Sequence, residues 1–414
     1  MATFSSAQAV QSSGKSSQFA FAAMTSLFFI WGFVTALNDI LIPHLKAAFE
    51  LNYFQAMLVQ FCFFGAYFIV SPLAGKLIER IGYIRGIITG LLTMATGCLL
   101  FYPAAEVAVY GVFLLGLFVL ASGITILQVS ANPYVAILGE ERTAASRLSL
   151  AQAINSLGHT LAPLFGAALI FGALHADSAK AVQLPYLILA AAVVATAIGF
   201  RFLQLPELSS PAASDSEQKD SIWHHKHLVF GAIAIFVYVG AEVSIGSFLV
   251  NYFAQPDIAG LSEQQASQMV SYYWGGAMLG RFAGALITRW IAPVYVLAFN
   301  SVIAVLLLLV TINSTGTVAV WSVLAVGFFN SIMFPTIFTL AIRGLGDLTS
   351  RGSGLLCQAI VGGALLPLLQ GLVADASSVQ WSFLVPALAY FYIGWYALSG
   401  SNISHNSSET KATS

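Results

Sequence analysis

The chain has 414 residues, of which 58% are apolar and only 8% are charged, and its formal net charge is −1. Soluble domains carry about 25% charged residues, so this composition excludes an ordinary soluble protein and indicates a membrane protein with many spans. The near-zero net charge argues against a nucleic-acid partner. The three cysteines all lie in apolar runs and favour neither a disulfide framework nor a metal site.

Hydropathy predicts twelve membrane-spanning helices, because apolar runs of about 20 residues recur along the chain. The expected spans are 19–44, 54–78, 84–103, 108–134, 146–172, 183–205, 228–254, 267–289, 293–312, 317–342, 352–374 and 380–399. The corresponding domains are an N-terminal tail (1–18), a six-helix bundle (19–205), a linker (206–227), a second six-helix bundle (228–400) and a C-terminal tail (401–414). We therefore expect an all-α membrane protein.

The first span contains a carboxylate, Asp39, in the middle of apolar sequence. An ionisable group at this depth costs several kcal/mol, so it normally faces a partner, an ion or a water-filled cavity. Asp39 is therefore a candidate transport residue.

The loop after the second span reads Gly75–Lys–Leu–Ile–Glu–Arg–Ile–Gly–Tyr–Ile–Arg85. This pattern resembles the signature of the major facilitator superfamily, in which the charges of this loop latch against neighbouring helix ends. The resemblance implies a gating role for Gly75, Arg80, Gly82 and Arg85. The alternative is that Arg80 and Arg85 are only the positive charges of a cytoplasmic loop.

Three polar residues of the fifth span, Gln152, Asn155 and His159, are spaced i, i+3 and i+7 and so share one helix face. Amides offer a donor and an acceptor together, which matches the hydroxyl groups of a sugar. We expect Gln152 and Asn155 to contact sugar. The alternative is hydrogen bonding between helices, and for His159 simple packing.

The two bundles carry an internal repeat at an offset of 204 residues, with identical pairs that include Arg147 and Arg351, and Gly158 and Gly362. This indicates duplicated six-helix halves. Parallel halves of this kind are the major facilitator arrangement, with substrate bound between them near the bilayer midplane. We add Arg147 and Arg351 to the gating candidates.

The second bundle offers further candidates for sugar contact. Tyr238 and Glu242 lie one turn apart on the seventh span, and Glu242 is the stronger candidate because a carboxylate accepts two hydroxyl groups or titrates. Gln358, Trp274 and Asn330 complete the sugar-binding set, with Trp274 as a stacking surface for a sugar ring. The alternative for Trp274 is ordinary packing in a chain rich in aromatic residues.

Proline and glycine pairs interrupt several spans. Asn132–Pro133 is expected to end the fourth helix, and Phe334–Pro335 lies near the matching place in the tenth. Gly362–Gly363 and Pro367 are expected to interrupt the eleventh. The alternative is close packing of small residues.

Lysine and arginine predict the orientation. If both termini and the linker are cytoplasmic, that side carries every basic residue, Arg281 included, except Lys46 and Lys180. We therefore expect a multi-pass protein of the inner membrane with both termini in the cytoplasm.

Several strings narrow the family, among them Ser26–Leu–Phe–Phe–Ile–Trp–Gly32, Leu37–Asn–Asp–Ile–Leu–Ile–Pro43, Ala131–Asn–Pro–Tyr134 and Tyr238–Val–Gly–Ala–Glu242. Together they resemble the fucose–proton symporter family of the major facilitator superfamily over nearly the full length. The stretch from Thr125 to Tyr134 is similar to its glucose/galactose branch, which includes sodium-dependent members.

The resemblance implies an acidic residue on the first helix, which Asp39 matches, and a second on the fourth, where this chain has Gln128. An amide does not take up and release a proton, so this departure favours an alkali cation held by oxygen ligands from Asp39, Asn38, Thr35 and Gln128. Gln128 also belongs to the sugar-binding set. Proton coupling through Asp39, Glu242 or His159 remains the alternative.

The expected function is therefore sodium-coupled symport of a neutral hexose of the glucose, galactose or mannose type by alternating access. The alternative is a proton-coupled hexose or fucose symporter. We expect no enzyme activity, no cofactor, and no metal beyond the coupling cation. The expected partners are the sugar and membrane lipid, and the protein is expected to be a monomer.

Overall fold

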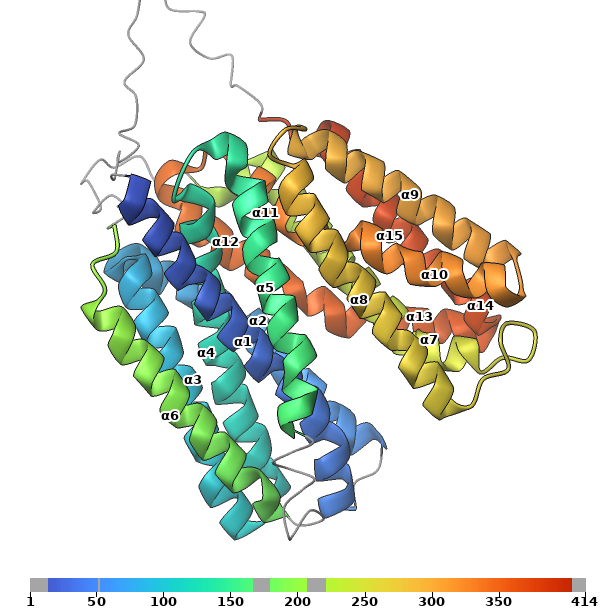
Figure 1. Cartoon of the computed structure of the whole chain (residues 1–414), viewed down its shortest axis with the longest axis horizontal. Coiled ribbons are helices and arrows are strands. Elements are labelled where there is room, and N and C mark those ends of the chain that lie inside the picture. The colour runs from blue at the N-terminus through green and yellow to red at the C-terminus, as the bar shows by residue number, and fades with distance from the viewer. Residues whose placement is uncertain (1–13, 51–52, 167–178, 207–220, 404–414) are drawn as a thin grey trace, which may run out of the picture.

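The computed structural model describes residues 14–50, 53–166, 179–206 and 221–403. Within these ranges the side chains of residues 14–17, 38–48, 53–57, 163–166, 179, 181, 263 and 264 are outside the description. The described chain is helical and falls into two bundles that lie side by side in Figure 1.

The first bundle contains six long helices: α1 (Gly14–Ala48), α2 (Tyr53–Ile81), α3 (Tyr83–Val107), α4 (Tyr110–Ile137), α5 (Ala144–Gly166) and α6 (Gln183–Phe202). Helix α4 packs against α3 and α2, while α1 packs against α5. These helices match the six spans predicted for the first half.

The second bundle starts with three unbroken helices: α7 (Lys226–Phe253), α8 (Glu263–Ile287) and α9 (Pro293–Asn313). The last three spans are each divided: α10 (Gly316–Asn330) with α11 (Met333–Ile342), α12 (Thr349–Gln358) with α13 (Gly362–Ala376), and α14 (Val379–Ser382) with α15 (Leu384–Trp395). The all-α fold with twelve helical spans is confirmed.

Ten helical segments of the described chain are long and apolar enough to cross a membrane. Helices α5 and α8 are not among them. Both carry polar side chains along their length and pack against each other between the two halves. Their lower hydropathy therefore fits helices whose polar side chains face the other half and the cavity between the halves.

The sequence repeat appears again in the packing. A Cβ atom added to Gly158 of α5 would lie 2.4 Å from the carbonyl oxygen of Phe29 in α1. A Cβ atom added to Gly362 of α13 would lie 2.0 Å from the carbonyl oxygen of Phe236 in α7. Matching glycines thus permit the matching helix crossing in each half.

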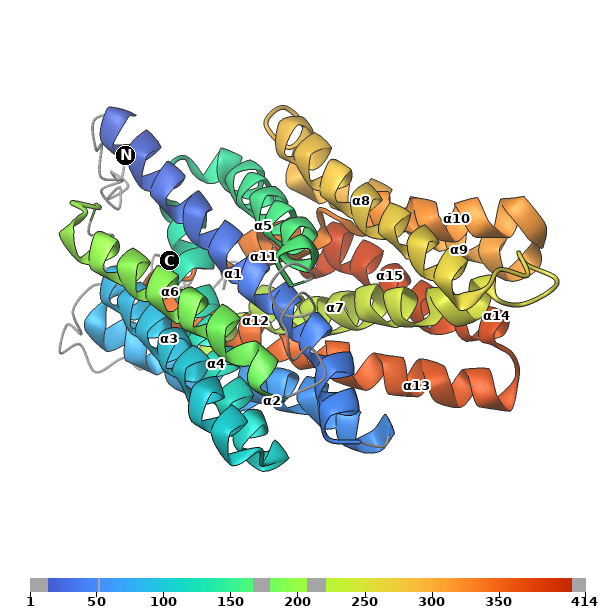
Figure 2. The same cartoon turned by 60° about the horizontal axis from the view of Figure 1, so that its bottom comes forward.

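The two halves meet along two seams, α2 with α12 and α5 with α8. Figures 1 and 2 show the bundles diverging away from these seams. In the α2–α12 seam, a Cβ atom added to Gly75 would lie 2.9 Å from the carbonyl oxygen of Ser350. The backbones therefore approach closely where the halves touch.

Two of the expected helix breaks differ from the structure. Helix α4 does not end at Asn132–Pro133 but continues to Ile137. Pro133 has no N–H with which to bond the carbonyl of Val129, and Ser353 of α12 donates its hydroxyl to that carbonyl instead, at 3.0 Å. The eleventh span is interrupted at Ala359–Val361, just before Gly362, and α13 continues through Pro367 without a break.

The break at the tenth span is confirmed, because α10 and α11 are separated by a turn at residues 331–332, close to Pro335.

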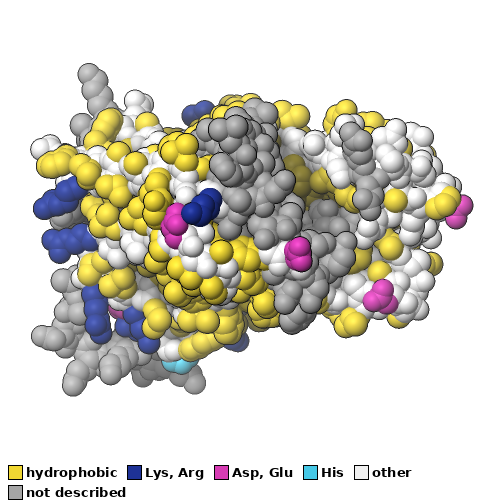
Figure 3. Space-filling view, turned by 90° about the horizontal axis from the view of Figure 1, so that it is seen from below, with side chains coloured by type: hydrophobic (Ala, Val, Ile, Leu, Met, Phe, Trp, Pro, Cys, Tyr) yellow, Lys and Arg dark blue, Asp and Glu magenta, His cyan; other side chains and the backbone are white. Residues whose placement is uncertain are grey.

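Charged side chains are unevenly distributed over the surface. In the face shown in Figure 3, basic side chains gather along one edge, apart from most of the acidic ones.

Candidate functional site

A cavity of about 600 Å³ lies between the two halves. Helices α1, α2, α4 and α5 line it on one side, and α7, α8 and α11 line it on the other. Its volume falls in the range of small-molecule sites. Eight of the predicted sugar or cation residues lie on its wall: Thr35, Gln128, Gln152, Asn155, His159, Tyr238, Glu242 and Trp274.

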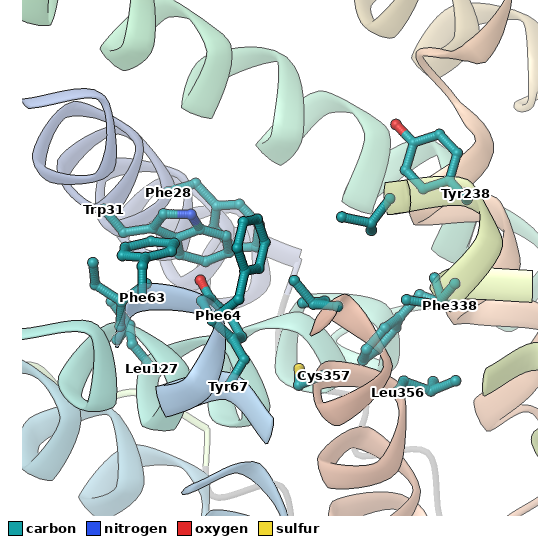
Figure 4. Close-up of a cluster of buried hydrophobic side chains, with 14 of the residues drawn as sticks. Phe28, Trp31, Phe63, Phe64, Tyr67, Leu127, Tyr238, Phe338, Leu356 and Cys357 are labelled. Carbon is teal, nitrogen blue, oxygen red and sulfur yellow. The ribbon is translucent and has the colours of Figure 1, made fainter. Parts of the chain in front are cut away.

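The N-terminal wall combines amides with aromatic rings. Gln128 donates its amide N–H to the hydroxyl of Tyr67, at 2.5 Å. Gln152 also lies on the wall and is 8% exposed. Thr35 lies on the same wall, and its hydroxyl oxygen has no hydrogen-bond partner among the described residues. Figure 4 shows Trp31 and Tyr67 on this side, with Tyr238 across from them.

Asn155 has a structural contact as well as a place on the wall. Its amide nitrogen donates to the carbonyl of Phe28 in α1, at 2.8 Å. A ring nitrogen of His159 lies 3.2 Å from the Asn155 carbonyl oxygen. The interhelical bond that sequence analysis left open as an alternative is therefore present, and it holds the cavity face of α5 against α1.

The C-terminal wall carries an ion pair. The carboxylate of Glu242 accepts a hydrogen bond from the Tyr238 hydroxyl at 2.8 Å and from the Arg281 guanidinium at 3.3 Å. The two charged side chains are only 13% and 15% exposed. Arg281 also donates to the hydroxyl of Ser156 on α5, which belongs to the other half.

Arg281 is the charged residue on the described cavity wall that the sequence did not predict, while Tyr67 and Ser156 are unpredicted polar residues of the same wall. Arg281 was counted among the cytoplasmic charges, and the structure corrects this by placing it within α8 on the cavity wall. A signal was present, because Arg281 lies eight residues before the end of the expected span 267–289. Basic residues inside a span normally face a partner or a cavity.

Two predicted sugar residues do not line the cavity. The amide nitrogen of Gln358 donates to the carbonyl oxygen of Phe68 at 3.1 Å. This carbonyl lacks its usual helical partner, because Pro72, four residues later in α2, has no N–H. Asn330 is fully buried and donates to the hydroxyls of Tyr273 and Tyr390. Both side chains therefore stabilise helix contacts in this structure.

Two predicted cation ligands, Asn38 and Asp39, belong to α1, but their side chains lie outside the described residues. No group of three or more metal-ligating His, Cys, Asp or Glu side chains occurs in the described part of the chain. The remaining candidates, Thr35 and Gln128, both lie on the cavity wall.

The gating candidates lie where the halves meet or next to that region. Arg351 of α12 donates to the carboxylate of Glu79 in α2 at 2.6 Å, so it bridges the halves. Gly75 lies in the same seam. Gly82 is the N-cap residue directly before α3 and has a φ of +82°, a backbone conformation that favours glycine.

The other gating candidates do not bridge the halves in this structure. Arg147, the repeat partner of Arg351, bonds the carbonyls of Val135 and Ala136 at the end of α4, within its own half. Arg80 and Arg85 are exposed at the end of α2 and the start of α3.

Chemically, this arrangement suits a small polar ligand that both halves contact at once. Amides and hydroxyls read hydroxyl groups, and aromatic rings cover apolar ligand faces. A cavity between two duplicated bundles is also the place where alternating access operates.

Comparison with known proteins agrees with this geometry. The sequence profile of the Major Facilitator Superfamily matches residues 19–357. The chain is similar to a glucose/galactose transporter of Brucella abortus, with 58% identity over 94% of this chain and 96% of that protein. It is also similar to the L-fucose-proton symporter of Escherichia coli, with 36% identity over 91% of this chain and 92% of that protein.

A crystal structure of the transporter FucP in the outward conformation has the same fold. It matches with a TM-score of 0.85 and 35% sequence identity, covering 92% of this chain and 98% of that one.

Proposed function

Because this chain belongs to the Major Facilitator Superfamily, we propose that it is a secondary active transporter that carries a neutral hexose across the inner membrane by alternating access. The observation that carries the proposal is the cavity between the halves, lined by Gln128, Gln152 and Asn155 on one side and by Glu242 on the other. Glucose, galactose and mannose are the hexoses expected from the resemblance.

The relatives support a sugar as the substrate. The Brucella relative is named a glucose/galactose transporter and the Escherichia coli relative an L-fucose-proton symporter. Polar groups on both walls match a ligand with hydroxyls all around its ring. Transport needs no bond to be broken, and we propose no enzyme activity.

We propose sodium as the coupling ion. Gln128 does not titrate, and its amide lies on the same wall as Thr35, whose hydroxyl oxygen has no partner among the described residues. Hard cations prefer such oxygen ligands, and Asp39 would supply the balancing charge. Proton coupling is the second candidate, because a relative 36% identical over most of the chain is named a proton symporter.

We also propose that the seams mark the cytoplasmic side. Thirteen of the fifteen basic residues other than Arg281 fall on that side of the expected topology. The structure would then be open toward the outside, like the FucP structure it resembles. Cysteine labelling from each side of the membrane tests this orientation, and labelling of exposed position 347 from outside only would contradict it.

Uptake of labelled glucose and galactose into proteoliposomes tests the function and the ion together. An imposed sodium gradient without a pH gradient should drive accumulation, and a pH gradient without sodium should not. Accumulation driven by the pH gradient alone would replace sodium with the proton. Absence of hexose uptake and of counterflow under every gradient would reject the transport proposal itself.

A further inference from the structure

Arg281 is a largely buried cation whose position is set by helices α5 and α7 and by the turn between α10 and α11. Its Nε atom donates to the carbonyl oxygen of Ser331 at 3.4 Å. This carbonyl has no helical partner, because Pro335, four residues later, has no N–H. Its two terminal nitrogens donate to Glu242 of α7 and to Ser156 of α5. The guanidinium plane is therefore oriented by contacts in three directions.

Glu242 is the counter-charge of this cation. Both side chains line the cavity, and both are less than one sixth exposed. Glu242 and Arg281 together contribute no net charge to the wall. An arginine keeps its charge when its partner is removed, because its guanidinium does not lose a proton in proteins.

The inference rests on the proposed hexose transport and names the class of sugar that the same site accepts. We propose that the ion pair of Glu242 with Arg281 sets the charge selectivity of the cavity. With the pair intact the wall is neutral and the site takes neutral sugars but rejects hexuronic acids. With Glu242 neutralised, Arg281 becomes a fork-shaped receptor for a carboxylate.

A hexuronic acid is a suitable probe of this pair. It differs from the hexose only in that a carboxylate replaces the terminal CH₂OH group, so the ring and its other hydroxyls stay the same. The corresponding neutral amide, a hexuronamide, has nearly the same shape as the acid. Any difference between acid and amide therefore reports charge and not size.

The first experiment uses the unaltered chain in nanodiscs and measures displacement of labelled glucose. We expect glucuronamide to displace glucose at least tenfold more effectively than glucuronate. Equal displacement by acid and amide, whether strong or weak, would overturn the proposal. If the protein binds none of glucose, galactose and mannose, the hexose assignment and this inference are both overturned.

The second experiment moves the selectivity. Glu242→Gln should raise the affinity for glucuronate relative to glucose at least tenfold, because it leaves an unpaired guanidinium on the wall. The double variant Glu242→Gln/Arg281→Gln should lose this gain. Asp257→Asn, an exposed carboxylate in the turn after α7, serves as the matched control and should keep the original ratio.

Two results of the second experiment would overturn the proposal: no gain for glucuronate in the properly folded Glu242→Gln variant, or a gain that persists in the double variant. If Glu242→Gln does not fold, the comparison of acid with amide on the unaltered chain decides alone. A gain that appears equally in Asp257→Asn would show a surface effect and would also count against the pair.

Discussion

Two prolines near matching places in the two halves, 202 residues apart where the repeat offset is 204, have different consequences. Pro133 in α4 and Pro335 in α11 each leave one carbonyl of the preceding turn without a helical partner. In the N-terminal half, the hydroxyl of Ser353 from the other half donates to the freed carbonyl of Val129, and α4 continues. In the C-terminal half, the guanidinium of Arg281 donates to the freed carbonyl of Ser331, and the helix is divided at residues 331–332.

The comparison teaches that a proline frees a carbonyl in either half, and that the surrounding packing decides which side chain bonds it. The first carbonyl ties the halves together, while the second helps to orient a buried cation on the cavity wall. The described walls differ in the same way: the N-terminal one carries amides and His159, and the C-terminal one carries an ion pair. The predictions below test this division, from the largest expected effect to the smallest.

The largest effect should follow from removing the predicted charge on the first helix. Asp39→Asn should abolish cation-driven accumulation while leaving sugar exchange in counterflow, because the ion loses its balancing charge and the amides remain. The measurement is uptake and counterflow in the same proteoliposomes, with exposed Asp375→Asn as control. Accumulation at the original level would remove Asp39 from the coupling site.

The matched glycines test whether the two halves depend equally on their close crossings. Gly158→Ala and Gly362→Ala should each destabilise the protein by about 1–3 kcal/mol, since the new Cβ would meet backbone oxygen. Gly199→Ala has open space around the new Cβ and should be neutral or slightly stabilising. Thermal unfolding in detergent measures all three, and an unchanged Gly362→Ala variant would contradict the repeat in packing.

Two amides of α5 separate sugar contact from structural contact. Gln152→Ala should raise the sugar concentration for half-saturation about 3- to 10-fold, as expected for a lost hydrogen bond of roughly 1 kcal/mol. Asn155→Ala should do the same and also lower the melting temperature, because its bond to Phe28 is lost. An unchanged half-saturation value would remove the substituted residue from the binding set.

The smallest effect concerns the carbonyl freed by Pro133. Ser353→Ala removes one bond between the halves, worth about 1 kcal/mol, and should shift their equilibrium toward separation by about fivefold. Spin labels at exposed positions 80 and 347 report the distance between the halves. Ser301→Ala, whose hydroxyl bonds only within α9 in this structure, is the control. Equal distance distributions in both variants would show that Ser353 does not hold the seam.

Much of the fold was predictable because its signals lie along the chain. Hydropathy predicted twelve spans, and the repeat that includes Gly158 and Gly362 predicted two duplicated halves. The prediction for α4 was wrong because the consequence of Pro133 depends on Ser353, which lies far away in the sequence. Sequence alone does not state whether a distant hydroxyl reaches a freed carbonyl.

The site was predictable in residue type but not in arrangement. The spacing in α5 correctly placed Gln152, Asn155 and His159 together on the cavity wall, because helical periodicity is a local property. Gln358 and Asn330 look equally suited to sugar by residue type, yet both bond other helices. Arg281 was assigned to a cytoplasmic loop because counting the basic residues on each side of the membrane does not consider how deep a residue lies within its helix.

The sequence by itself determined that this is a duplicated, twelve-span membrane protein with polar residues on one face of α5, since composition, hydropathy and repeats need no knowledge of distant contacts. Only the tertiary structure decided that Glu242 meets Arg281 and that Ser156 from the other half meets the same guanidinium. The physical reason is that the rotation and depth of one helix against another are fixed by close packing between them, which no single helix encodes.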